Sequence, residues 1–100
     1  MEITIKDKAY KLKYTLRALF IFEQITGKMF DIKTLTDEYV YFYCLIMANN
    51  KDANLTFDEF IDAIDEDPTL MNKYKDFMDS EMKKQKQINS KEESNSKKKH

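Results

Sequence analysis

Residues 49–60, with the sequence NNKDANLTFDEF, carry the oxygen-bearing side chains that calcium prefers. If Glu59 is the bidentate twelfth ligand of an EF-hand loop, the loop covers residues 48–59. Its first position is then Ala48, which has no side-chain oxygen, and its sixth, where a sharp turn needs Gly, is Ala53. Because both positions fail, we interpret the stretch as the start of a helix and keep a degenerate calcium site as an alternative.

A capping box accounts for the remaining residues of this stretch. Thr56 is suited to cap a helix, and Glu59, three residues later, is suited to reach back to it. The apolar residues that follow recur at helical spacing and form one stripe: Phe57, Phe60, Ile61 and Ile64. The pattern predicts an amphipathic helix over residues 57–66.

The remaining candidates for chemistry are few. Cys44 lies inside an apolar run, which is typical of a buried, inert thiol, and the lone histidine is His100. A Gly-rich phosphate loop and a Cys/His set for zinc are missing. Four acidic residues could hold a divalent ion, but such a cluster is more typical of a solvated helix end: Asp62, Asp65, Glu66 and Asp67. The sequence therefore predicts no enzyme, no metal site and no cofactor.

Composition favours a small helical domain. The 100 residues include one Gly and one Pro, which leaves few tight turns. The single cysteine excludes an intramolecular disulfide and fits a reducing compartment. The longest apolar run covers residues 39–48, about half of what a bilayer span needs. We expect a soluble intracellular protein that does not enter membranes.

The expected elements form an α+β fold. Alternating residues predict an N-terminal β-hairpin over residues 2–14 with its turn at Asp7 and Lys8, packed on about four helices. The helices are expected at about residues 16–27, 37–49, 57–66 and 68–83. In the first, apolar residues cover most of the circumference and leave one wet stripe at Arg17, Gln24 and Lys28.

Cap residues support these helix boundaries. Thr15 and Gly27 fit the two ends of the first helix, the second is expected to start at Thr36, and Asp67 with Pro68 fits the start of the fourth.

Charge divides the chain into an acidic body and a basic tail. Residues 1–82 hold 10 Lys/Arg against 16 Asp/Glu, and residues 83–100 hold 7 Lys against 2 Glu. The tail is polar and low in apolar residues, so we expect one globular domain over residues 1–83 and a disordered basic tail over 84–100.

Met and aromatic side chains suggest a surface that binds another protein. Unbranched Met beside aromatic rings makes an adaptable apolar groove. The tyrosines of the second helix need hydrogen-bond partners at the surface or at an interface. The candidate partner-binding residues are Met71, Tyr74, Phe77, Met78, Met82, Tyr39 and Tyr43. The alternative interpretation, compatible with the first, is that the stripe of the fourth helix packs on the core.

Three segments resemble the tail assembly chaperones of long-tailed (siphovirus-type) bacteriophages and their prophages. They are KLKYTLRAL at residues 11–19, FEQITGK at 22–28 and FDEFIDAID at 57–65. The resemblance covers roughly residues 3–75, and the N-terminal hairpin departs from the mainly helical members. It implies a non-catalytic chaperone in the host cytoplasm that binds the tape measure protein. It also implies that a frameshifted, extended form contacts the tail tube protein.

Two further expectations complete the sequence prediction. The hairpin edge, the tyrosines of the second helix and the Met-bearing fourth helix together offer more apolar surface than eighty folded residues readily cover. We therefore expect a reversible homo-oligomer. The alternative function is a small adaptor or regulatory protein whose basic tail contacts nucleic acid or an acidic partner. That tail lacks interleaved aromatic residues for base stacking, so nucleic acid is the less favoured partner.

Overall fold

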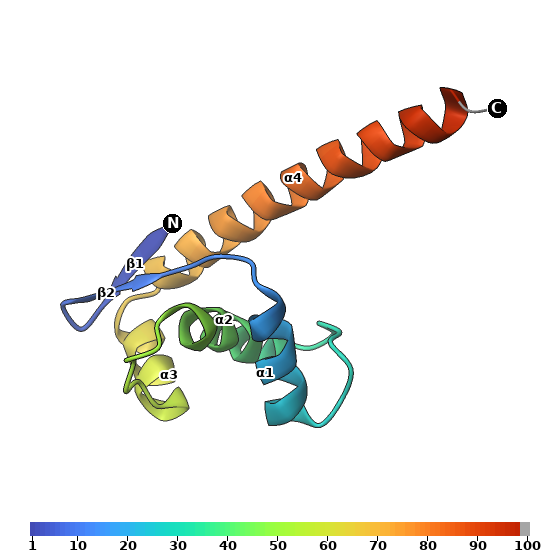
Figure 1. Cartoon of the computed structure of the whole chain (residues 1–100). Coiled ribbons are helices and arrows are strands. Elements are labelled where there is room, and N and C mark those ends of the chain that lie inside the picture. The colour runs from blue at the N-terminus through green and yellow to red at the C-terminus, as the bar shows by residue number, and fades with distance from the viewer. Residues whose placement is uncertain (99–100) are drawn as a thin grey trace.

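The computed structural model describes the backbone of residues 1–98 and the side chains of residues 1–84. Two strands, β1 (Glu2–Ile5) and β2 (Lys8–Lys11), precede four helices: α1 (Leu16–Thr26), α2 (Leu35–Asn49), α3 (Phe57–Glu66) and α4 (Thr69–Lys98). The strands form one antiparallel hairpin that lies beside the helices (Figure 1). The α+β prediction of a hairpin on about four helices is confirmed.

The hairpin turn lies one residue earlier than predicted. Strands β1 and β2 pair with Ile5 opposite Lys8, so the turn residues are Lys6 and Asp7, both at positive φ (51° and 66°). Two positive φ values are what a tight hairpin turn requires when it follows the twist of its strands. The second strand also ends at Lys11, so Tyr14 is not part of it and is exposed.

The first two helices begin at threonine caps. The Thr15 hydroxyl accepts the Ala18 N–H, and Gly27 ends α1 in the left-handed region at φ 71°, both as predicted. Helix α2 begins at Leu35 with Thr34 as its cap, not at Thr36. The reason is that Thr34 is followed three residues later by Asp37, which completes a capping box.

The last two helices share Asp67. Helix α3 spans the predicted residues, and its capping box joins Thr56 and Glu59 as expected. Asp67 ends α3, and its carboxylate then accepts the Thr69 N–H at 3.1 Å at the start of α4. This arrangement makes the sharp change of direction between the two helices.

Helix α4 continues to Lys98, where the sequence prediction ended it at residue 83 and expected disorder from residue 84. No Gly or Pro follows Pro68, and Lys, Gln and Glu are good helix formers, so nothing local ends the helix. Figure 1 shows its second half projecting away from the other elements. Residues 99–100 lie outside the described residues.

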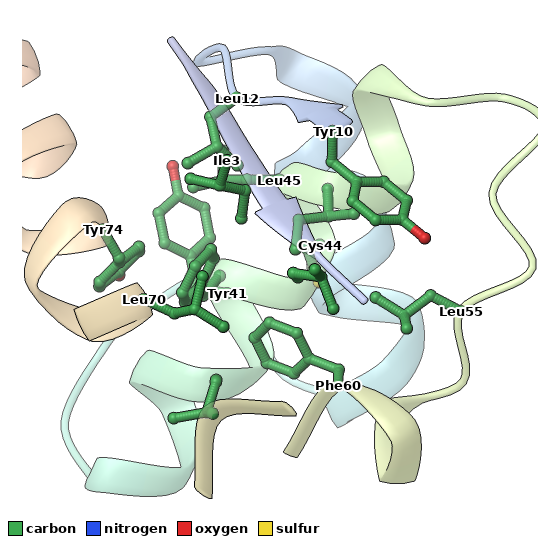
Figure 2. Packing of buried hydrophobic residues seen from close by; sticks show 14 of the residues in the cluster. Ile3, Tyr10, Leu12, Tyr41, Cys44, Leu45, Leu55, Phe60, Leu70 and Tyr74 are labelled. Carbon is green, nitrogen blue, oxygen red and sulfur yellow. The ribbon is translucent and has the colours of Figure 1, made fainter. Parts of the chain in front are cut away.

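The core lies between the hairpin and the helices, with α2 at its centre (Figure 2). The Phe42 ring of α2 stacks on Tyr74 of α4, with centroids 4.7 Å apart, and makes a T-shaped contact with Phe60 of α3 at a centroid distance of 5.0 Å. A second aromatic group joins α1 to α2 through Phe22, Phe30 and Tyr41. Paired rings of this kind stabilise a core beyond their buried area.

Two asparagines fix the hairpin to the end of α2. The Asn50 amide accepts the Lys11 N–H and donates to the Lys11 carbonyl, both at 3.0 Å. The Asn49 amide donates to the Lys13 carbonyl at 2.8 Å. Asn49 and Asn50, the first residues of the calcium-like stretch, therefore make hydrogen bonds to β2 and the residues after it, where a further strand would otherwise pair.

Asn50→Ala should destabilise the protein by about 1–2 kcal/mol, because both bonds to Lys11 are lost while water compensates in part. Asn54→Ala is the matched control, since Asn54 is exposed and four residues away, and should change stability by less than about 0.5 kcal/mol. Urea unfolding followed by circular dichroism measures both. Equal effects of the two substitutions would contradict the role given to Asn50.

Candidate partner-binding surface

Six of the seven predicted partner-binding residues pack in or against the core. Tyr74 and Phe77 are buried. Tyr39, Tyr43, Met71 and Met78 are half-buried and pack against the core. Met82 is exposed, with 57% of its surface open. Most of the apolar stripe of α4 thus packs on the core, because the first turns of α4 cover α2.

The hydroxyls of two of these tyrosines bond inside the protein. Tyr43 donates to the Leu55 carbonyl at 2.6 Å, and Tyr74 donates to the Glu38 carboxylate at 2.6 Å. Burial raises the pKa of both phenols, and for Tyr74 the bond to Glu38 raises its pKa further. These two side chains join α2 to its neighbours and need no partner protein to satisfy them.

Exposed apolar surface gathers instead on α1 and the connection to α2. Among residues with described side chains, eight large hydrophobic residues are exposed, and four of them lie there: Leu16, Phe20, Ile25 and Met29. A fifth, Leu35, is the first residue of α2. Helix α1 buries Ala18 and Phe22 completely. Residues two positions away on a helix point to the opposite side, so Phe20 faces away from that core. The sequence signal for this surface is an apolar residue count too large for one buried stripe.

We name the α1 outer face as Leu16, Arg17, Phe20, Ile21 and Gln24. These side chains line a shallow hollow of about 400 Å³. Leu16 and Phe20 are four residues apart, so they lie along one line of the helix. The Arg17 guanidinium is not ion-paired to any side chain that the structure describes. The face therefore offers an apolar row with one cation at its side, which suits a helix bearing apolar residues and a carboxylate.

The connection between α1 and α2 is held by Asp37. Its Oδ2 atom accepts the Lys33 N–H at 3.0 Å, the Thr34 N–H at 3.2 Å and the Lys28 ammonium at 2.9 Å. The hydrogen bonds from the Lys33 N–H and the Lys28 ammonium lower the pKa of Asp37 to about 2, against the opposing effect of burial. Asp37 thereby fixes the segment that carries Met29.

Asn50 and Glu59, two oxygen-bearing residues of the calcium-like stretch, make hydrogen bonds within the fold. Asn50 bonds to Lys11, and Glu59 accepts the Thr56 N–H at 3.2 Å, which lowers the pKa of Glu59. Within the described residues, no three His, Cys, Asp or Glu side chains come together in a way that could hold a metal ion. The acidic residues at the end of α3 are exposed on the helix surface.

No family model, curated protein or solved structure matches this chain. Among the helices that the structure describes, none has the length and the hydropathy that a membrane span requires. The side chains of the basic tail from residue 85 onward lie outside the described residues. The adaptor alternative, which depends on them, therefore stays a prediction.

Cys44 should not react in the folded protein. It is fully buried, and burial raises the pKa of its thiol from 9.0 to about 12. We expect labelling by a thiol reagent at pH 8 to be slower than for the unfolded chain by about a thousandfold or more, since the thiolate fraction alone falls that far. Labelling rates with and without urea measure this, and equal rates would contradict the burial.

Asp37→Asn should flatten the acid dependence of stability. The folded pKa of about 2 lies below the ordinary 3.8, so the contribution of Asp37 is present above about pH 4 and is lost as pH falls toward 2. Urea unfolding between pH 5 and 2 should show a smaller slope for Asp37→Asn than for the wild type. The control is Asp31→Asn, an exposed aspartate of the same connection. A slope unchanged in Asp37→Asn but reduced in Asp31→Asn would contradict the assignment.

Proposed function

We propose that this protein is a non-catalytic phage tail assembly chaperone that binds an amphipathic helix of the tape measure protein through the α1 outer face. The observation that carries the proposal is the exposure of Leu16 and Phe20, at 62% and 54%, on a short helix whose other side is core. Large apolar side chains exposed side by side are typical of interaction sites.

The resemblance and this surface coincide in the sequence. Two of the three segments that resemble tail assembly chaperones, residues 11–19 and 22–28, include the beginning and the end of α1, with Phe20 and Ile21 between them. The third, residues 57–65, makes most of α3. Leu16, Arg17 and Gln24 of the α1 outer face lie in these segments. This overlap supports α1 as the client-binding element, in place of the Met-bearing stripe of α4, most of which packs on the core.

The charge around α1 indicates which charge the client helix carries. Residues 11–33, which include α1, hold five Lys/Arg against two Asp/Glu, whereas residues 57–82 hold two Lys against nine Asp/Glu. Arg17 lines the hollow itself. The client helix we propose therefore places apolar residues at a spacing of three or four against Leu16 and Phe20, and a carboxylate against Arg17.

Other parts of the proposal rest on the resemblance alone. They are the host cytoplasm as the location, the prophage origin, and contact with the tail tube protein through an extended form. No described residue favours catalysis, and the chain acts by covering apolar client surface until the tail assembles.

Leu16→Asp with Phe20→Asp should weaken binding of a tape measure fragment by about tenfold or more, because both apolar contacts are lost. Co-purification after co-expression, followed by titration calorimetry, measures this. Met82→Asp is the matched control, since Met82 is about as exposed as Phe20 but lies on α4. Circular dichroism confirms that each variant is folded.

The two variants show whether the client binds at α1 or at α4. Loss of binding in Met82→Asp with retention in the α1 double variant would move the site to the end of α4. A wild-type protein that binds no part of the tape measure protein would contradict the proposed function itself.

A further inference from the structure

The two edges of the β-hairpin differ in their free backbone groups. In an antiparallel pair, alternate residues direct N–H and C=O to the partner strand or outward. Ile5 and Lys8 flank the two-residue turn and Ile3 pairs with Tyr10. The 2.8 Å bond from the Leu12 N–H to the Met1 carbonyl follows the same alternation. The outward groups therefore belong to Glu2 and Thr4 on β1, and to Ala9 and Lys11 on β2.

The β2 edge is closed at Lys11 by another part of the chain. The Asn50 amide satisfies both outward groups of Lys11. The segment after it lies alongside the strand, and the two together line a hollow of about 170 Å³ that includes Ala9 and Lys51. A side-chain amide that bonds both N–H and C=O replaces a neighbouring strand at this position.

The β1 edge is open. Within the part of the chain whose side chains are described, no hydrogen bond reaches the outward N–H or C=O of Glu2 or Thr4. Both side chains are exposed, while Ile3 and Ile5 of the same strand are buried. A strand with one unpaired edge and a fixed inner face is a template for addition of a further strand.

We propose that β1 pairs with β1 of a second copy of this chain, antiparallel about a twofold axis at Ile3, to form a four-stranded sheet across a dimer. In this register Glu2 of each copy lies opposite Thr4 of the other. Both residues have outward backbone groups, so the two symmetry-related pairs form four N–H···O bonds. The proposal does not depend on the chaperone function.

Side-chain charge selects this register. Across the outer face, the row reads Lys11, Glu2, Thr4 of the second copy and Ala9 of the second copy, so no like charges lie directly opposite. A shift by two residues in one direction places Glu2 opposite Glu2. In the other direction it places Glu2 opposite Lys6, which is in the turn at positive φ. A shift by one residue would move the inner isoleucines out of alignment with the core face.

Thr4→Pro tests the edge, because proline removes an outward N–H and costs no bond inside the hairpin. Ala9→Pro is the matched control: Ala9 lies directly opposite Thr4, and its N–H points to the other edge. In sedimentation equilibrium, Thr4→Pro should raise the dimer dissociation constant by about tenfold or more, since two symmetric bonds are lost. Ala9→Pro should leave it unchanged. A monomeric wild type, or equal effects of the two variants, would overturn the proposal.

Cysteine cross-linking decides the register and does not require Thr4→Pro to fold. A bonded pair places Cα atoms about 5.5 Å apart, within disulfide range, whereas diagonal neighbours lie about 7–8 Å apart. A mixture of Glu2→Cys and Thr4→Cys chains should therefore oxidise to a mixed disulfide several times faster than either chain alone. Equal rates in the mixture and in the separate chains would overturn the register, and no cross-link at all would overturn the dimer.

Discussion

The contact on which the fold depends is the Phe42 ring between two other aromatic rings. Phe42 is fully buried, stacks on Tyr74 of α4 and makes a T-shaped contact with Phe60 of α3. Both later helices thus pack on α2 through one side chain. The same helix holds the hairpin through the asparagines at its end. Helix α2 is apolar on all sides because each side meets a different neighbour.

The exposure of α1 follows from this arrangement. One face of α2 is enough to receive Ala18 and Phe22, and its other faces contact the hairpin, α3 and α4. An eleven-residue helix that is apolar around most of its circumference then has no second layer to cover Leu16 and Phe20. A domain this small has too little interior to bury all of its apolar residues. The remaining apolar residues lie at the surface, where they are available for a partner.

Local chemistry made much of the fold predictable. Thr15, Gly27 and Thr56 stand at helix ends for reasons that a few neighbouring residues determine, and those predictions are confirmed. The errors have equally local causes. Thr34 was missed because the sequence offers two threonines, and only the carboxylate of Asp37, held by Lys28, selects between them. The hairpin turn was predicted one residue too late because it contains no Gly to mark its position.

The candidate surface was less predictable than the fold. Leu70, Tyr74 and Phe77 have the same spacing whether they cover α2 or a client, so periodicity cannot tell a core stripe from a groove. The sequence did contain a signal for α1, since its apolar residues outnumber what one buried stripe can hold. Choosing between α1 and α4 requires knowing which helix reaches the centre, and that depends on contacts between distant residues such as Tyr74 and Glu38.

The two proposed surfaces are of different physical kinds and are compatible with each other. The β1 edge binds through backbone groups and selects a strand by register, whereas the α1 outer face binds through side chains and selects a helix by shape and charge. Helix α1 and the hairpin lie at different parts of the molecule, with α2 between α1 and the later helices (Figure 1). Pairing at β1 would therefore leave both α1 faces of a dimer free. Two linked faces bind a long helical client more tightly than one, because the second contact forms at high effective concentration.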